Sequence, residues 1–217
     1  MGQAKQIFLL SACVAIIVGS SLWIYLTQFN QPTFNAPLHQ RVGEVLAQET
    51  ARLIHTQGLV VVVTMDTSKA PELKAQMGVF ERTLKKLGPI TIKELPVDTE
   101  DKPQYRTGAG LSSRRFLRII KKSASANAIV SFIGAPHMTE QEVAQIEKAP
   151  KFIAECRSAD KIKRLFDKNI LQAAVVNRFE YPAPIKHNPK TPNQWFEKYY
   201  QVVTAENASN LPGNAGD

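Results

Sequence analysis

Cysteine is nearly absent from this sequence, with only Cys13 and Cys156 among 217 residues. Cys13 falls in an apolar segment near the start of the chain, so Cys156 has no partner in the rest of the chain for an internal disulfide. The four histidines show no ligand spacing with one another or with acidic residues. The sequence therefore predicts neither a disulfide framework nor a metal site, and it indicates no cofactor.

The common catalytic and nucleic-acid motifs are also lacking. The segment TGAGLSS at 107–113 follows a polar loop and is not followed by a lysine, so it is neither a phosphate-binding loop nor a dinucleotide fingerprint. The first predicted strand ends before Asp66 without the paired acids of a phospho-receiver domain. No stripe of arginines alternates with aromatic residues, which argues against nucleic acid as a partner.

Charge is missing from residues 7–26 (IFLLSACVAIIVGSSLWIYL), and about 20 apolar residues match the hydrocarbon core of a bilayer. The length of this run and the lack of an A-x-A site favour a retained anchor over a cleaved signal. Trp23 and Tyr25 suit an interfacial aromatic belt, and Lys5 favours a cytoplasmic N-terminus. We therefore predict a single-pass transmembrane anchor over 1–27, with the following domain extracytoplasmic, either periplasmic or extracellular.

Lipid attachment is an alternative for this segment. The tetrad Leu10-Ser11-Ala12-Cys13 looks like a lipobox, the pattern in which the cysteine is acylated after cleavage. Cleavage there would leave residues 14–26 as an unusually apolar mature N-terminus. The anchor is the favoured interpretation, and lipidation at Cys13 stays open.

Alternating helix and strand patterns follow a polar linker at 28–37. Helical spacing of apolar residues predicts helices at 38–55, 71–87, 112–124, from Thr139 onward, 160–168 and 192–203, and buried or alternating runs predict strands at 59–64, 90–97, 128–133, 151–155 and 171–176. This alternation predicts one α/β domain over 38–203, a three-layer sandwich with a five-stranded parallel sheet in the order 2-1-3-4-5. Residues 204–217 have no periodicity and are predicted to be disordered.

Ligands bind such sheets at the carboxyl ends of the strands, where this chain places several polar side chains. Four arginines on this rim can converge on a carboxylate or phosphate, while pairing with Glu155, Glu180 or solvent is the alternative. The sequence thus predicts a site for an anionic small molecule. The candidate ligand-binding residues are Asp66, Ser68, Arg106, Ser112, Ser113, Arg114, His137, Arg157 and Arg178.

Aromatic residues gather near the end of the predicted domain, at Trp195, Phe196, Tyr199 and Tyr200. Their spacing of one, three and four places them on about half of one helix. They are either part of the core or a docking surface for a partner, where Trp and Tyr are favoured anchors. The formal net charge of +8 suits anionic lipid headgroups, cell-wall polymers or an acidic protein as neighbours, and a solvated basic surface without a partner is the alternative.

The stretch from Leu84-Lys85-Lys86-Leu87-Gly88 to Ala126-Asn127-Ala128-Ile129-Val130 resembles one lobe of the type I periplasmic binding proteins. In that family a helix ending in leucine and glycine leads to a strand, and a later helix leads to an apolar strand. The resemblance implies a solute-binding or sensing relative with a flavodoxin-like lobe. This chain has only one such lobe, so the cleft between lobes is missing unless two chains supply it.

These features favour a membrane-anchored, extracytoplasmic and non-enzymatic module that binds a ligand or a protein. One alternative is a structural component of a membrane assembly. A further alternative is a hydrolase or transferase that uses Cys156, paired with His137, or the Ser112/Ser113 loop.

Overall fold

The structure, a computed structural model, describes residues 3–25, 34–97, 111–159, 162–178 and 189–211. The chain divides into two compact units, Met1–Asn35 and Ala36–Asp217. The second unit carries the α/β fold.

The first unit contains helix α1, Gln3–Ile24. Large apolar side chains along α1 are exposed, among them Ile16, Ile17 and Trp23. Among the residues that the structure describes, no helix combines the length and the apolar character needed to cross a membrane. The transmembrane helix predicted over 1–27 is therefore not supported.

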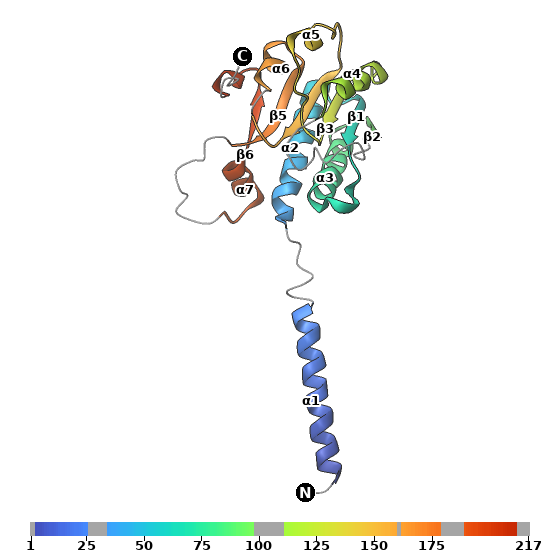
Figure 1. Cartoon of the computed structure of the whole chain (residues 1–217), viewed down its shortest axis with the longest axis vertical. Coiled ribbons are helices and arrows are strands. Elements are labelled where there is room, and N and C mark those ends of the chain that lie inside the picture. The colour runs from blue at the N-terminus through green and yellow to red at the C-terminus, as the bar shows by residue number, and fades with distance from the viewer. Residues whose placement is uncertain (1–2, 26–33, 98–110, 160–161, 179–188, 212–217) are drawn as a thin grey trace. The chain divides into compact units, whose positions relative to one another are not determined.

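A mixed six-stranded sheet forms the centre of the second unit, in the order β2-β1-β3-β4-β5-β6 (Figure 1). The first five strands in this order pair in parallel, and β6 pairs with β5 in antiparallel fashion. The predicted α/β class and the order 2-1-3-4-5 are confirmed, and the sixth strand is an addition. The strands are β1 (Gly58–Thr64), β2 (Ile90–Pro96), β3 (Ala128–Ser131), β4 (Lys151–Cys156), β5 (Leu171–Asn177) and β6 (Tyr200–Thr204).

Helices cover both faces of the sheet, and each face has its own apolar core. One face, which we call the pocket face, is covered by α2 (Ala36–Ile54), α3 (Pro71–Leu87) and α7 (Pro192–Tyr199). The opposite face, which we call the closed face, is covered by α4 (Ser113–Lys122), α5 (Glu140–Val143) and α6 (Lys163–Asp167). Two short 3-10 turns, η2 (Thr67–Lys69) and η4 (Ala208–Asn210), complete the described elements.

Local sequence explains most of these elements. The valine run of β1 is buried on both faces, as a central parallel strand requires. Helix α3 begins with Pro71 at its first position, where the missing N–H costs nothing. Helix α7 begins with a capping box in which Thr191 accepts from the Gln194 backbone and the Gln194 side chain accepts from the Thr191 backbone.

The C-terminal part differs from the sequence prediction. The predicted helix at 192–203 ends at Tyr199, and the following residues form strand β6. Residues predicted to be disordered form the end of β6 and η4, where Ala208 and Leu211 are buried in the core of the closed face. Residues 212–217 and most of the predicted linker at 28–37 lie outside the described residues, and α2 already begins at Ala36.

Candidate functional site

A pocket of about 290 Å³ opens at the carboxyl ends of β1, β3, β4 and β5 on the pocket face. The N-terminal turns of α2 and α3 cover it from one side. Tyr200, the first residue of β6 and the residue directly after α7, also lines it. We call it the strand-end pocket. It is lined by His39, Met65, Ala70, Glu72, Leu73, Gln76, Phe132, Ile133, Gly134, Glu155, Arg157, Asn177 and Tyr200.

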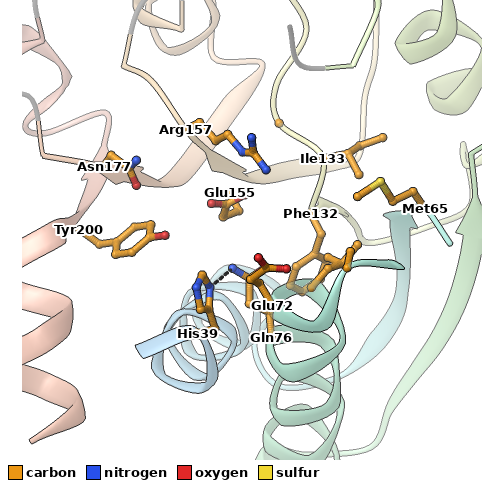
Figure 2. Close-up of a pocket in the computed structure, with 13 residues that line it drawn as sticks. His39, Met65, Glu72, Gln76, Phe132, Ile133, Glu155, Arg157, Asn177 and Tyr200 are labelled. Atoms are coloured by element: carbon orange, nitrogen blue, oxygen red, sulfur yellow. Dashed lines mark hydrogen bonds between the residues drawn. The ribbon is translucent and has the colours of Figure 1, made fainter. Parts of the chain in front are cut away.

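Side-chain alternation along the strands directs polar groups into the strand-end pocket. Ile153 belongs to the core of the pocket face, so Glu155 and Arg157, two and four residues later, follow on the same side. In the same way Val175 is followed by Asn177. Figure 2 shows Glu155, Arg157 and Asn177 projecting from the strand side, opposite His39 and Glu72 from the helix side.

Close packing of α2 on α3 fixes the helix side of the pocket. At Gly43 a Cβ atom would lie 2.0 Å from the Gln76 carbonyl oxygen, so the two backbones meet in a way that only glycine permits. One turn before Gly43, the His39 Nδ1 lies 3.2 Å from the Gln76 Nε2 (Figure 2). Because Nε2 is a donor, this hydrogen bond makes His39 Nδ1 the acceptor.

Glu155 is the electrostatic centre of the strand-end pocket. Burial raises the pKa of its carboxyl group to about 7, although the Arg157 guanidinium opposes this shift. Burial, with a further contribution from the Glu155 charge, raises the pKa of Tyr200 to about 12. Near neutral pH the pocket therefore offers a carboxyl group that can donate or accept a hydrogen bond, beside a hydroxyl that stays protonated.

Burial also lowers the pKa of His39, even though the nearby Glu72 charge acts in the opposite direction. His39 is thus neutral at pH 7, and Arg157 is the lining residue that carries a fixed positive charge. The carboxyl groups of Glu72 and Glu155 offset this charge. The strand-end pocket therefore does not concentrate positive charge, in contrast to the predicted anion site.

The predicted rim residues after β1 do not line the pocket. Asp66 caps the short turn η2 and accepts hydrogen bonds from the Ser68 backbone nitrogen at 2.9 Å and from the Ser68 hydroxyl at 2.7 Å. Both side chains are therefore engaged in local turn structure, and the pocket is lined by the neighbouring Met65 and Ala70 instead.

A second group of predicted residues lies on the closed face. The Ser113 hydroxyl donates to the Glu142 carboxylate, which also accepts from the Thr139 backbone nitrogen at 2.9 Å. His137 forms an isolated bridge with Ser112, and Arg114 is exposed at the start of α4. The Ser113–Glu142 hydrogen bond joins α4 to α5, and none of the predicted residues Ser112, Ser113, Arg114 and His137 lines the strand-end pocket.

The three predicted arginines that the structure describes do not converge. Arg157 lines the strand-end pocket, whereas Arg178 donates through Nε to the Glu197 carbonyl and ties β5 to α7. Arg114 lies on the closed face. Arg106 and Glu180 lie outside the described residues.

The four predicted aromatic residues, three on α7 and Tyr200 at the start of β6, belong mainly to the core. Phe196 and Tyr200 are buried in the core of the pocket face, and Trp195 and Tyr199 are half-buried against it. The Trp195 and Tyr199 rings stack at 5.7 Å between centroids, and the Lys198 ammonium lies 5.3 Å from the Tyr199 ring centre. Of the four, Tyr200 reaches the strand-end pocket.

Cys156 does not have the properties of a nucleophile. Its side chain is buried in the core of the closed face, and burial raises the pKa of its thiol to about 12. Among the described residues, no group of three or more His, Cys, Asp or Glu side chains is placed to hold a metal ion.

Sequence reasoning found Arg157 and missed most of the other polar lining. Glu155 could have been found from the sequence. It is the one acid of strand β4, it lies among buried residues, and it is two residues from Arg157, so both side chains lie on the same side of the strand. His39 and Gln76 had no signal of this kind, since their approach depends on the tertiary contact at Gly43.

The fold was compared with known proteins, and solved structures with a similar fold were found. No family model and no curated protein sequence matches the chain. Solved structures of solute-binding proteins do match it. The fold resembles one lobe of a periplasmic binding protein. The predicted resemblance to this lobe is confirmed, at identities that establish a likeness of fold.

Three of these structures illustrate the likeness. A sugar-binding protein of a Bacillus halodurans ABC transporter has 16% identity and a TM-score of 0.56, covering 80% of this chain and 64% of its own. The arabinose-binding protein AraP from Geobacillus stearothermophilus has 14% identity, a TM-score of 0.55 and coverages of 81% and 63%. A solute-binding protein from Burkholderia graminis in complex with D-arabinose has 13% identity, a TM-score of 0.53 and coverages of 80% and 62%. The chain thus spans less than two thirds of their length.

Proposed function

We propose that the chain is a binding module for a small, uncharged polar molecule, which it holds in the strand-end pocket. The observation that carries this proposal is the pocket's position at the carboxyl ends of four parallel strands, the location where open α/β sheets bind ligands. Its volume of about 290 Å³ lies at the small end of the range for ligand sites.

The lining favours a molecule with several hydroxyl groups. Glu155, Asn177 and the Tyr200 hydroxyl supply hydrogen-bond donors and acceptors on one side, and Phe132 and Met65 supply apolar surface. The carboxyl groups of Glu72 and Glu155 together offset the charge of Arg157, so the pocket lacks the excess positive charge that an anion needs. D-arabinose, which the Burkholderia graminis protein binds, has this chemistry and is the first probe to use.

Thermal shift measurements test the proposal on the full chain. We expect D-arabinose or a related pentose or hexose to raise the Tm, by several degrees at about one hundred times its Kd, because such a ligand stabilises the folded state by roughly 2.7 kcal/mol. Acetate and phosphate are expected to give no shift. If no sugar raises the Tm, or if phosphate does so, the proposal is wrong.

Two pocket variants and one matched control locate the binding. Asn177→Ala and Glu155→Gln each remove one polar group from the pocket and are expected to abolish the sugar-dependent shift. Glu94→Gln makes the same carboxyl-to-amide change on the exposed side of the edge strand β2 and is expected to keep it. Equal loss in all three variants would contradict binding in the pocket.

The proposed localisation is extracytoplasmic, at a membrane. It is supported by the uncharged run at residues 7–26 and by the exposed apolar side chains of α1, since an apolar surface of this kind needs lipid or a partner to cover it. We expect the full chain to stay with membranes after carbonate extraction. Ile16→Lys with Ile17→Lys is expected to release it, because transferring a lysine from water into the apolar part of a bilayer is costly. Release of the unmodified chain would contradict attachment through this segment.

The alternative of a cysteine-dependent hydrolase or transferase has a direct test. Because Cys156 is buried and its pKa is raised, we expect the Cys13→Ser variant to react with a thiol-specific electrophile only after denaturation. Rapid labelling of the folded variant would revive that alternative.

A further inference from the structure

Helix α4 presents a strongly basic outward face. Its inward side chains, Phe116, Ile119 and Ile120, are buried in the core of the closed face. The helix contains no acidic residue, and half of its ten residues are cationic. We call these five residues the α4 basic face: Arg114, Arg115, Arg118, Lys121 and Lys122.

Three of these cations lie at positions that cost stability to α4, whereas Lys121 and Lys122 in the last turn suit the helix dipole. Arg114 and Arg115 lie in the first turn, where the helix dipole favours anions. Arg118 is four residues from both Arg114 and Lys122, a spacing at which like charges repel each other. Departures from local helix rules are expected mainly where a protein has a functional reason for them.

Nothing in the described part of the chain neutralises the α4 basic face. Two ion pairs between described residues lie on α2, where Arg41 pairs with Glu44 and Arg52 pairs with Glu49, and neither involves α4. Arg114, Arg118, Lys121 and Lys122 are exposed, and Arg115 is half-buried. The charges are therefore available to an external anionic partner.

The residues of the α4 basic face favour anionic lipid over nucleic acid or protein as its partner. It carries no aromatic residue for base stacking, which single-stranded nucleic acids use. Leu117, the remaining apolar residue of α4, is half-buried and packs against the core of the closed face, so the basic face lacks the large anchors of a protein interface. A layer of anionic headgroups requires neither stacking nor an apolar anchor, because it attracts each lysine and arginine by charge alone.

We propose that the α4 basic face docks on a surface of anionic phospholipid through the cations of one helical stripe, Arg114, Arg118 and Lys122. This contact is separate from the strand-end pocket, which lies on the other face of the sheet. It uses charged side chains and none of the apolar residues of α1, so it predicts a dependence on lipid charge that apolar contacts do not give.

Vesicle flotation with the full chain tests this docking. Vesicles of phosphatidylcholine alone are compared with vesicles that also contain phosphatidylglycerol, and the measured quantity is the ratio of the two partition coefficients. We expect the unmodified chain to prefer the anionic vesicles and to lose this preference in high salt, because surface charges are screened.

A charge-reversal variant and a matched control locate the effect. Arg114→Glu/Arg118→Glu/Lys122→Glu is expected to lower the ratio about a hundredfold, at about fivefold for each cation lost. Lys74→Glu/Lys85→Glu/Lys86→Glu changes the net charge equally on the exposed side of α3 and is expected to lower it far less. Equal losses in the two variants would show attraction by net charge alone and would overturn the proposal.

A neutral variant guards against misfolding of the charge reversal. Arg114→Gln/Arg118→Gln/Lys122→Gln removes the repulsion within α4, so we expect a Tm at or above that of the unmodified chain together with loss of the lipid preference. An unchanged preference in this variant would overturn the proposal. The same result follows if a single-stranded RNA oligonucleotide binds through these residues more tightly than the anionic vesicles do.

Discussion

The two faces of the sheet end differently at the same carboxyl edge. On the pocket face the strands end in Glu155, Arg157 and Asn177, which face a cavity. On the closed face the same edge is filled by apolar side chains such as Met138 and Cys156. Polar residues follow the strands on both faces, so their presence in the sequence does not by itself indicate a site.

The helices account for this difference. On the pocket face the first turns of α2 and α3 bring His39 and Glu72 to the rim of the cavity and leave space beneath them. On the closed face the Ser113 hydroxyl bonds to Glu142, which connects α4 directly to the α5 capping box. A pocket at the strand ends therefore forms only where the first turns of the covering helices leave space above the ends of the strands.

The largest effect is expected from disrupting the α2–α3 contact behind the strand-end pocket. Gly43→Ala would place a methyl group 2.0 Å from the Gln76 carbonyl oxygen, so the helices must move apart. We expect a loss of about 3 kcal/mol in the free energy of unfolding and a loss of ligand-dependent thermal shifts. Urea unfolding and thermal shift assays measure the two effects.

The control for this variant lies on the same pair of helices. Gly78→Ala places the methyl group 3.6 Å from the Arg82 guanidinium, an ordinary contact. It is therefore expected to stabilise α3 by about 0.5 to 1 kcal/mol. A similar destabilisation by both substitutions would show that the close approach at Gly43 is not the cause.

The next largest effect is expected on the pocket face, where Glu155 makes the free energy of unfolding depend on pH. The pKa of Glu155 is raised to about 7 in the folded state, so its stabilising contribution is present below its unfolded pKa and is lost as pH rises through 7. Relative to Glu155→Gln, we expect the unmodified chain to lose on the order of 2 kcal/mol between about pH 5 and pH 8. Urea unfolding across this range measures the difference.

Two features of this experiment isolate Glu155. The lowered pKa of His39 destabilises the folded state as pH falls, but His39 is present in both proteins and its contribution cancels in the difference. The Glu94→Gln variant, altered at an exposed position, is expected to follow the pH curve of the unmodified chain. A difference curve for Glu155→Gln that is flat with pH would contradict the burial of its charge.

Much of the fold follows from apolar patterns in the sequence. The valine run of β1 and the regular stripe of α3 predict their elements because each pattern is local. Strand β2 falls at the sheet edge, as Pro96 in its sequence predicts. Strand β6 was missed because the aromatic spacing before it is helical, whereas Val202 and Val203 become a strand through pairing with β5.

The candidate site was less predictable than the fold. The rule for strand ends identified Arg157 but also selected Asp66, Ser113 and His137, which the structure uses in turns and helix junctions. Side chains alternate between the two faces of a strand, and this alternation decides which of two neighbouring residues faces the cavity. Whether a cavity exists depends on helix packing, for which the sequence has no local signal.

The smallest effect is expected at the junction of the closed face. Hydrogen bonds from Ser113 and from the Thr139 backbone hold the pKa of Glu142 below its usual range, so its contribution is present above its unfolded pKa and is lost as pH falls. This pH dependence is opposite in sign to that of Glu155.

We expect Ser113→Ala to lower the Tm slightly at pH 7 and to converge with the unmodified chain in acid. Glu142→Gln keeps an acceptor for the capping box without the charge, so its Tm should lack this acid-dependent change. If both variants and the unmodified chain show the same pH profile, the junction does not depend on the carboxylate, and the closed face is held by its apolar core.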